Sequence, residues 1–284
     1  IGAIVRNADL ARHPAFRAAF PSVAEALLSG ASGQLRNAAT LAGNLMQKTR
    51  CAYFQDAAAR CNRRNPGTGC EAVGGEARGH AVLGWSQHCI AVHPSDLCVP
   101  LVALDAVVEV AGPEGRRDIP LEDFHRLPGE TPERQTALEP GEMILGLRLP
   151  PASAAFRAHS RYLKLRERTS FAFALVSAAA SLTLESGVVR EARLALGGVA
   201  AKPWRARKAE ALLAGAKPER AAFARAAEAA LEGAAPSGDN ESKIELAKRL
   251  ALRALLLAAA GTPAETPASP GSVLTSLPEE AAHA

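Results

Sequence analysis

The chain has 284 residues, of which 48% are hydrophobic and 22% are charged, and its net charge is +4. This is the composition of an ordinary globular protein, at a length that fits two domains. The charge is spread along the chain and only 4% of the residues are aromatic, so we expect no nucleic-acid partner. No apolar stretch reaches the roughly 18–20 residues of a membrane span without Arg or Lys, so we expect no membrane insertion.

The first fifty residues contain helix signals and a run of small residues. Residues 1–6 read as a strand, and helices are expected at 10–13 and at 21–29, where apolar residues recur on one face. Residues 33–48 read as turns around the segment T-L-A-G-N (40–44). Small residues of this kind let backbone amides approach a phosphate or a flavin closely, although most Gly-Asn pairs are simple turns.

Four of the five cysteines, Cys51, Cys61, Cys70 and Cys89, lie in one segment that is poor in apolar residues. Turn formers such as those at 65–67 connect them, so this loop needs something other than a core to hold it. Three interpretations are open. Paired disulfides are typical of smaller secreted domains, zinc sites usually contain C-x2-C pairs that are absent here, and an iron–sulfur cluster also takes four thiolates.

Arginines flank these cysteines and would offset the negative charge of a cluster held by four thiolates. They are Arg50, Arg60, Arg63 and Arg64. Spacing alone leaves unligated cysteines as an equal alternative to a metal centre.

The fifth cysteine, Cys98, is expected to lie apart from the other four. It follows Ser95 by three residues, inside a helix that should begin at a Ser95 or Asp96 cap and continue through Leu101. A cysteine in such a setting behaves as a small buried hydrophobe with a raised pKa. We therefore predict that Cys98 does not ligate a metal.

The remaining sequence predicts an α+β fold with a boundary at Pro150-Pro151. Before that boundary short strands are expected at 81–84 and 90–92, a hairpin at 106–120 and a strand at 142–150. Beyond it the pattern predicts strands at 161–165, 172–184 and 188–199, and then helices at 204–213, 219–231 and 243–260. Residues 261–284 have the composition of a disordered tail.

Four segments, taken together, resemble one known family. They are G-Q-L-R-N-A-A-T-L-A-G-N-L (33–45), C-N-R-R-N-P-G-T-G-C (61–70), H-P-S-D-L (93–97) and S-F-A-F-A-L-V-S-A-A (170–179). The family is the FAD-binding subunit of molybdenum hydroxylases, the xanthine dehydrogenase and aldehyde oxidoreductase group. The chain most resembles the flavin subunit of bacterial periplasmic aldehyde oxidoreductases, which carries an additional [4Fe-4S] cluster. The resemblance runs in order from residue 1 to about residue 260.

The resemblance implies a fold and two sets of cofactor ligands. The fold is an FAD-binding (PCMH-like) domain at 1–150, with an iron–sulfur loop at 50–90, followed at 151–260 by a CO-dehydrogenase-flavoprotein-type domain of antiparallel sheet and helical bundle. The residues implied for FAD are Thr40, Gly43, Asn44, Asp96, Ile144 and Lys164, and those implied for a [4Fe-4S] cluster are Cys51, Cys61, Cys70 and Cys89. Without the resemblance, Asp96 reads as a helix cap and Lys164 as a solvated strand residue.

Relatives carry an upstream segment with a glycine-rich loop that grips the FAD pyrophosphate, so we expect weaker FAD binding by a chain that lacks it. The resemblance also implies two partners, a molybdopterin-binding large subunit and a [2Fe-2S] small subunit. The location it implies is cytoplasmic, or periplasmic if the complex is exported folded with a signal-bearing partner.

The function implied is electron transfer within an oxidoreductase. The sequence contains no Ser-His-Asp arrangement, paired carboxylates or H-E-x-x-H motif that would indicate hydrolysis. The chain would be the flavin and iron–sulfur subunit of a molybdenum-dependent hydroxylase and would not bind the organic substrate itself. The alternatives are a zinc-stapled structural or nucleic-acid-binding module and a flavin-free copy of the subunit.

Overall fold

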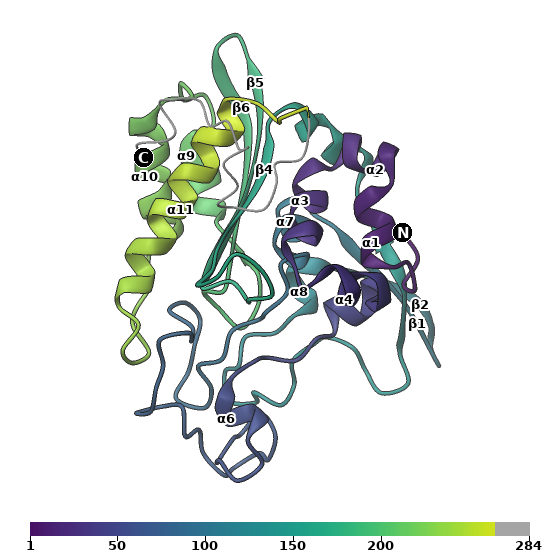
Figure 1. Cartoon of the computed structure of the whole chain (residues 1–284), viewed down its shortest axis with the longest axis vertical. Coiled ribbons are helices and arrows are strands. Elements are labelled where there is room, and N and C mark those ends of the chain that lie inside the picture. Colours follow the sequence, from purple (N-terminus) through teal and green to yellow (C-terminus); the bar gives the residue numbers. More distant parts are fainter. Residues whose placement is uncertain (265–284) are drawn as a thin grey trace.

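A four-stranded antiparallel sheet separates two hydrophobic cores (Figure 1). The structure is a computed structural model that describes residues 1–264. The strands follow the order β4 (Ser160–Leu165), β5 (Val176–Glu185), β6 (Val188–Gly197) and β7 (Trp204–Arg205). Successive side chains of a strand point to opposite faces, so β5 contributes Ala178 and Ala180 to the C-terminal core and Ala179 to the N-terminal core. Because both faces are covered, β5 is buried along most of its length.

The N-terminal core lies between short helices and a small second sheet. That sheet is antiparallel in the order β2 (Gly115–Pro120), β1 (Val107–Gly112) and β3 (Met143–Arg148). The helices are α1 (Asn7–Arg12), α2 (Pro14–Ala19), α3 (Pro21–Ser29), α4 (Gly33–Ala38), α5 (Leu41–Leu45), α7 (Cys98–Ala103) and α8 (Leu121–Phe124). A 3-10 helix, η1 (Pro151–Ala158), leads from this part into β4.

Three helices rich in Ala and Leu cover the other face of the four-stranded sheet (Figure 1). They are α9 (Arg207–Leu213), α10 (Arg220–Ala230) and α11 (Ser242–Ala259). The small buried side chains of α11, such as Ala251 and Ala254, let the helix lie close to β5. The hairpin from β5 to β6 turns at Ser186 and Gly187, whose φ angles of 51° and 79° suit a two-residue turn.

The segment with four cysteines forms a long irregular loop at one end of the molecule, and α6 (Ala52–Gln55) is its one helix among the described residues (Figure 1). Its apolar core is small: only Ala72, Ala77 and Ile90 are buried together there. Gly75 is needed for close packing, because a Cβ atom on it would lie 2.3 Å from the Tyr53 hydroxyl. The expectation of a loop with little core of its own is confirmed.

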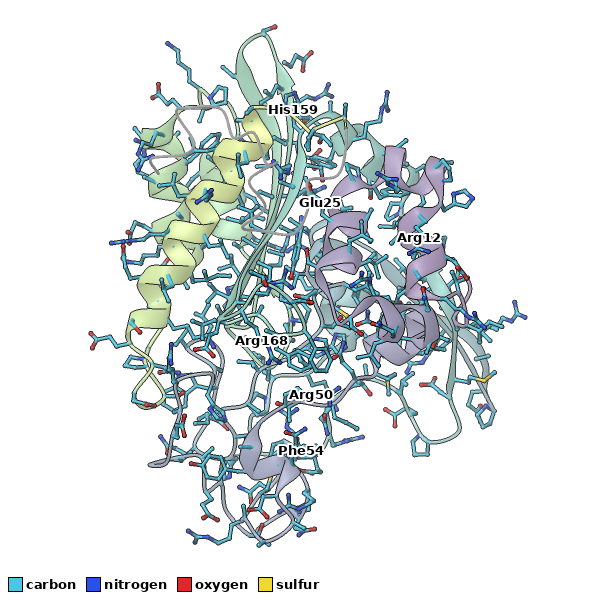
Figure 2. All side chains as sticks on the ribbon, viewed as in Figure 1. Arg12, Glu25, Arg50, Phe54, His159 and Arg168 are labelled. Atoms are coloured by element: carbon cyan, nitrogen blue, oxygen red, sulfur yellow. The ribbon has the colours of Figure 1, made fainter. Side chains whose placement is uncertain are left out.

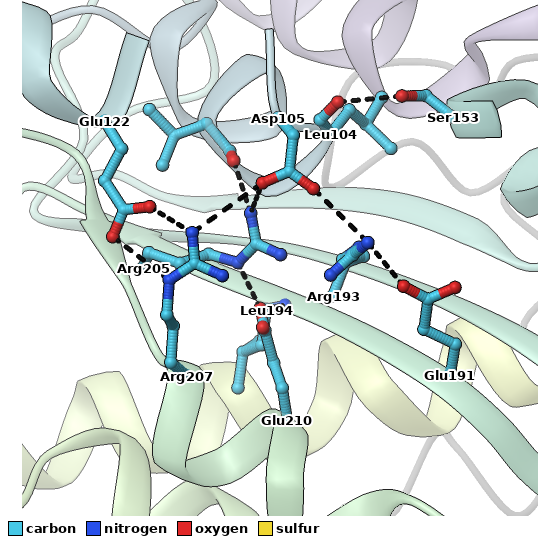
Figure 3. Close-up of polar contacts among 11 residues, drawn as sticks. Leu104, Asp105, Glu122, Ser153, Glu191, Arg193, Leu194, Arg205, Arg207 and Glu210 are labelled. Atoms are coloured by element: carbon cyan, nitrogen blue, oxygen red, sulfur yellow. Dashed lines mark hydrogen bonds and ion pairs between the residues drawn. The ribbon is translucent and has the colours of Figure 1, made fainter. Parts of the chain in front are cut away.

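Polar contacts join the two parts of the fold at the end of α7 (Figure 3). Arg205 donates from Nη1 to the carbonyl of Val102 at 2.6 Å and to Asp105 Oδ1 at 3.0 Å. The same guanidinium donates from Nε to Glu210 of α9, while Arg193 of β6 also pairs with Asp105. A buried arginine therefore links the N-terminal part to β6, β7 and α9.

Several sequence predictions of secondary structure differ from the structure. Residues 1–6 form two isolated bridges in place of a strand, from Gly2 to Gly146 and from Arg6 to Thr40. The Ala3 amide donates to the Leu145 carbonyl and the Ile1 carbonyl accepts from the Leu147 amide, both at 2.9 Å, without a full ladder to β3. Residues 81–84 and 90–92 are not strands but an extended pair joined by the Ala81 amide and the Ile90 carbonyl at 2.8 Å. Residues 33–48 contain α4 and α5 where turns were expected.

Most of the tail predicted at 261–284 lies outside the described residues. Among residues 1–264, no helix has the length and the apolar composition needed to cross a bilayer.

Candidate functional site

A cleft of about 860 Å³ opens between the N-terminal helices, the 94–97 segment and the strands β4 and β5. It contains four of the six residues predicted to contact FAD, namely Gly43, Asn44, Asp96 and Lys164. Thr40 and Ile144 do not line it. The cleft therefore gathers most of a site whose members are scattered over more than a hundred residues of sequence.

The floor of the cleft is a buried ion pair. Lys164 Nζ lies 2.7 Å from Asp96 Oδ2, and the lysine side chain is 1% exposed. The other carboxylate oxygen, Oδ1, accepts a hydrogen bond of 2.6 Å from the Tyr162 hydroxyl. Burial, followed by the charge of Asp96, raises the pKa of Tyr162, so its hydroxyl stays protonated as a donor. Lys164 is thus not the solvated residue that its strand position alone suggests.

The side chain that binds the first amide of α7 is that of Ser95 and not that of Asp96. The Ser95 hydroxyl accepts the Cys98 amide at 3.3 Å and donates to Asn44 Oδ1 at 2.7 Å. Gln47 donates to the same Asn44 oxygen at 2.6 Å. These contacts fix the Asn44 side chain against the cleft wall.

The two predicted residues outside the cleft have structural positions nearby. The Thr40 hydroxyl caps α5 by accepting the Gly43 amide at 3.2 Å, which orients the start of the helix that carries Gly43 and Asn44. Ile144 is buried on β3 in the N-terminal core, opposite Val110. Their contact with a flavin stays a prediction.

Cationic side chains lie along one wall of the cleft. Arg36 lines it and donates to the Gly30 carbonyl at 2.7 Å, while its neighbour Arg166, which is not part of the lining, donates to the Ser29 carbonyl at 3.0 Å. Burial, and then the neighbouring charges of Arg12 and Arg166, lower the pKa of Arg36. In the described part of the chain, neither Arg36 nor Arg166 has a carboxylate partner. This wall is suited to an anionic group.

Two exposed aromatic side chains flank the cleft, and the sequence did not single them out individually. Phe171 is 56% exposed and Phe173 is 50% exposed. The guanidinium of Arg168 lies 5.6 Å from the Phe171 ring centroid, and that of Arg50 lies 5.1 Å from the Phe173 centroid. Figure 2 shows Arg168 and Arg50 between the sheet and the cysteine loop. The segment S-F-A-F (170–173) was the available sequence signal for these two residues. Aromatic side chains that are exposed beside a cleft suit stacking on a planar ring.

The four loop cysteines are free thiols that lie near one another. Cys61 and Cys70 face each other across a backbone bridge. Burial raises the pKa values of Cys51 and Cys70, and a smaller contribution in the same direction comes from Cys89. Cys70 also contributes, in the same direction, to the raised pKa of the Cys51 thiol. These effects place the sulfurs of Cys51, Cys70 and Cys89 in one region, and the backbone bridge to Cys70 brings Cys61 beside them.

The sulfur atoms are nevertheless not in mutual contact. Among the described residues, only His93, Cys98 and His125 form a group of three or more potential ligand atoms that lie mutually within 4.8 Å. No three of the four loop sulfurs are therefore that close. Backbone amides of Tyr53 and Phe54 face the Cys51 sulfur and lower the pKa of its thiol, in opposition to burial.

The arginines around the loop bind its backbone and its neighbours. Arg64 donates to the carbonyls of Phe54 at 2.6 Å and Tyr53 at 3.2 Å, and also to Ala59. Arg63 donates to the Gln135 side chain at 3.3 Å. Because these partners are neutral, both guanidinium charges remain uncompensated beside the cysteines.

Cys98 behaves as expected from the sequence. It is completely buried in the N-terminal core, and burial raises the pKa of its thiol to about 12. Its sulfur lies near the rings of His93 and His125, whose centroids are 4.1 Å apart. His125 donates from Nε2 to the Leu45 carbonyl at 2.9 Å, and burial lowers the pKa of this ring to about 4. These histidines are neutral packing partners near pH 7.

The cleft and the cysteine loop meet at Cys51 and His80, which both line the cleft. The His80 Nε2 atom lies 3.1 Å from Cys51 Sγ. Burial, and then the charge of Lys243, lower the pKa of His80. A centre held by the loop would therefore lie at the rim of the cleft.

Comparisons with known proteins agree with this architecture. Residues 1–152 match the family described as the FAD binding domain in molybdopterin dehydrogenase, and residues 161–259 match the CO dehydrogenase flavoprotein C-terminal domain. The chain is 49% identical over 250 residues to the aldehyde oxidoreductase FAD-binding subunit PaoB of Escherichia coli (strain K12), covering 88% of this chain and 74% of that protein.

Solved structures show the same fold. Carbon monoxide dehydrogenase from Hydrogenophaga pseudoflava superposes with a TM-score of 0.67 at 27% identity, and quinoline 2-oxidoreductase from Pseudomonas putida 86 with 0.64 at 25%. Each comparison covers 92% of this chain and 74% of the other. The predicted fold class, an FAD-binding domain followed by a CO-dehydrogenase-flavoprotein-type domain, is confirmed. The chain belongs to the family of FAD-binding subunits of molybdopterin-dependent oxidoreductases.

Proposed function

We propose that this chain is the electron-transfer subunit of a molybdenum hydroxylase of the aldehyde or xanthine oxidoreductase type. It would receive electrons from a molybdopterin-binding large subunit through a [2Fe-2S] small subunit and deliver them to an acceptor. The observation that carries the proposal is the cleft that unites Gly43, Asn44, Asp96 and Lys164 beside a cationic wall. The similarity to PaoB, named as an FAD-binding subunit of aldehyde oxidoreductase, supports the same reading.

The cleft fits a flavin dinucleotide in three respects. Its 860 Å³ volume lies in the range of small-molecule sites. Arg36 in its lining supplies positive charge for a pyrophosphate, while Phe171 and Phe173 offer aromatic faces. The six residues proposed to hold FAD remain Thr40, Gly43, Asn44, Asp96, Ile144 and Lys164. A bound flavin would supply the one- and two-electron chemistry, whereas the residues of the cleft would position it and set its potential.

We also propose that Cys51, Cys61, Cys70 and Cys89 hold a [4Fe-4S] cluster. A single zinc ion, with Zn–S bonds of about 2.3 Å, would draw four sulfurs to about 3.8 Å from one another. The sulfurs of this loop share one region, but no three of them lie mutually within 4.8 Å. The sulfurs are therefore not arranged around a single ion, whereas a multinuclear centre, in which each thiolate binds a different iron, holds its thiolates further apart. The free guanidinium charges of Arg63 and Arg64 would stabilise its negative charge.

We also propose that the domain boundary lies near residue 150 and that the chain assembles with the two partner subunits. A cytoplasmic location, or a periplasmic one reached by export of the folded complex, also remains a proposal.

Cofactor analysis of the complex, purified anaerobically with its neighbouring subunits, tests the function. We expect FAD, together with four iron and four acid-labile sulfide attributable to this chain, the stoichiometry of a [4Fe-4S] cluster. The optical spectrum separates this result from the zinc-stapled alternative, because zinc is colourless. Stoichiometric zinc without labile sulfide would exclude the cluster, and a complex without flavin would exclude the assignment of the cleft.

A further inference from the structure

The residue of interest is His80, whose ring faces a sulfur atom of the cysteine loop. Its Nε2 atom lies 3.1 Å from Cys51 Sγ, well within hydrogen-bond reach of sulfur. A thiolate that ligates a metal has no proton to donate. The nitrogen that faces it must therefore carry the hydrogen and act as the donor.

His80 is held in place by residues far away in the sequence. Its amide donates to the Ala77 carbonyl at 2.7 Å. Its own carbonyl accepts from Lys243 Nζ at 2.8 Å and from Asn240 Nδ2 at 3.1 Å. The Lys243 side chain, on α11, is almost completely buried. The C-terminal part of the fold therefore fixes the backbone that presents the histidine to the sulfur.

We propose that His80 is a positioning residue that donates an Nε2–H hydrogen bond to Cys51 and thereby raises the reduction potential of the centre held by the cysteine loop. This inference rests on the [4Fe-4S] cluster proposed above. A hydrogen bond to a ligand sulfur stabilises negative charge, and the reduced form of a cluster carries one negative charge more than the oxidised form. The bond therefore favours the reduced form.

The position of His80 indicates where this effect on the reduction potential would act. His80 and Cys51 both line the cleft assigned to FAD. A higher potential makes the centre a better electron acceptor at the boundary between loop and cleft.

The test is an EPR-monitored redox titration of the assembled complex under anaerobic conditions. His80→Leu removes the donor, His80→Gln keeps an N–H group, and His88→Leu makes the same change at an exposed histidine of the same loop. We expect His80→Leu to shift the cluster midpoint to a lower potential, His80→Gln to shift it less, and His88→Leu to leave it unchanged. The flavin midpoint in the same samples serves as an internal reference.

Equal midpoints in wild type and His80→Leu, with intact iron and sulfide, would overturn the role of His80 but leave the cluster assignment standing. Wild-type complex without iron and sulfide would overturn both. If His80→Leu does not retain the cluster, the hydrogen bond is tested on the wild-type complex instead. Pulsed EPR on protein labelled with ¹⁵N-histidine should detect a nitrogen coupled to the reduced cluster, and the absence of that coupling would refute the hydrogen bond.

Discussion

Lys164 and Asp96 form an ion pair of 2.7 Å in which the lysine side chain is 1% exposed, and the two residues belong to different parts of the fold. Asp96 precedes α7, whereas Lys164 lies on β4. Two charges removed from water repay their desolvation only with good geometry and further hydrogen bonds. Tyr162 and the Ser29 carbonyl supply those bonds. The pair is therefore a vulnerable point for stability and, under the proposed assignment of the cleft, for flavin binding.

The first prediction concerns this pair. Asp96→Asn should lower the free energy of unfolding by about 3–5 kcal/mol, because it leaves the Lys164 charge buried without a partner. Urea denaturation measures the loss. Glu245→Gln is the matched control, since it breaks the exposed Glu245–Arg249 pair, which should contribute at most about 0.5 kcal/mol. Equal losses in both variants would contradict the assignment of Asp96 as a buried partner.

The second prediction concerns the cationic wall. Arg36→Gln should weaken FAD binding about ten- to a hundred-fold, since a hydrogen bond to a charged group contributes about 1.5–3 kcal/mol. Fluorescence titration of the apoprotein with FAD measures this affinity. Arg249→Gln, which removes an exposed arginine on α11, is the control and should bind FAD as the wild type does. Unchanged affinity in Arg36→Gln would place the pyrophosphate elsewhere.

The third prediction separates the fifth cysteine from the other four. Cys98→Ala should leave iron, sulfide and the optical spectrum intact, because Cys98 is buried in the N-terminal core with a thiol pKa of about 12. Cys89→Ser should abolish or convert the cluster. Iron and sulfide analysis of both variants checks this. If Cys98→Ala loses the cluster and Cys89→Ser keeps it, the ligand assignment is wrong.

The fourth prediction concerns acid. The pKa of His125 falls from 6.5 to about 4 on folding, so between these values the unfolded chain binds a proton that the folded chain does not. Stability therefore falls as the pH decreases through this window, by about 3 kcal/mol in all for a difference of about 2.5 units. His125→Gln cannot titrate and should lose less stability between pH 7 and pH 4. Denaturant unfolding at both pH values measures the difference, with exposed His88→Gln as the control that keeps the wild-type slope.

The sequence predicted most elements of the C-terminal part because their signals were local. The β5–β6 hairpin was placed from Glu185-Ser-Gly187, and in the N-terminal part helix α3 was placed at its observed bounds, 21–29. The short helices at 33–45 were missed, since five or six residues carry too little periodicity. The strands expected near Ala81 and Ile90 were wrong because apolar residues there pack as single extended segments. Both errors lie where tertiary contacts decide the local structure.

The site was predictable only in part, for a related reason. Lys164 reads as a solvated strand residue until Asp96 is known to lie beside it, and nothing local to either residue reveals the pair. His80 gave no signal at all, because its role depends on Cys51, 29 residues earlier in the chain. Cys98, by contrast, was correctly predicted as a buried residue from the apolar side chains around it.

The ion pair at the floor of the cleft joins two parts of the fold, and this has a consequence for biogenesis. Asp96 and Lys164 are 68 residues apart, and Glu25, which binds Arg161 beside them, is 136 residues from its partner. Such long-range contacts form late, because the chain must first close large loops. If the cleft is the flavin site, as proposed above, the nascent chain cannot hold a flavin until both cores have formed and docked on the sheet. Cofactor loading would then act as a checkpoint on completed folding before the subunit joins its complex.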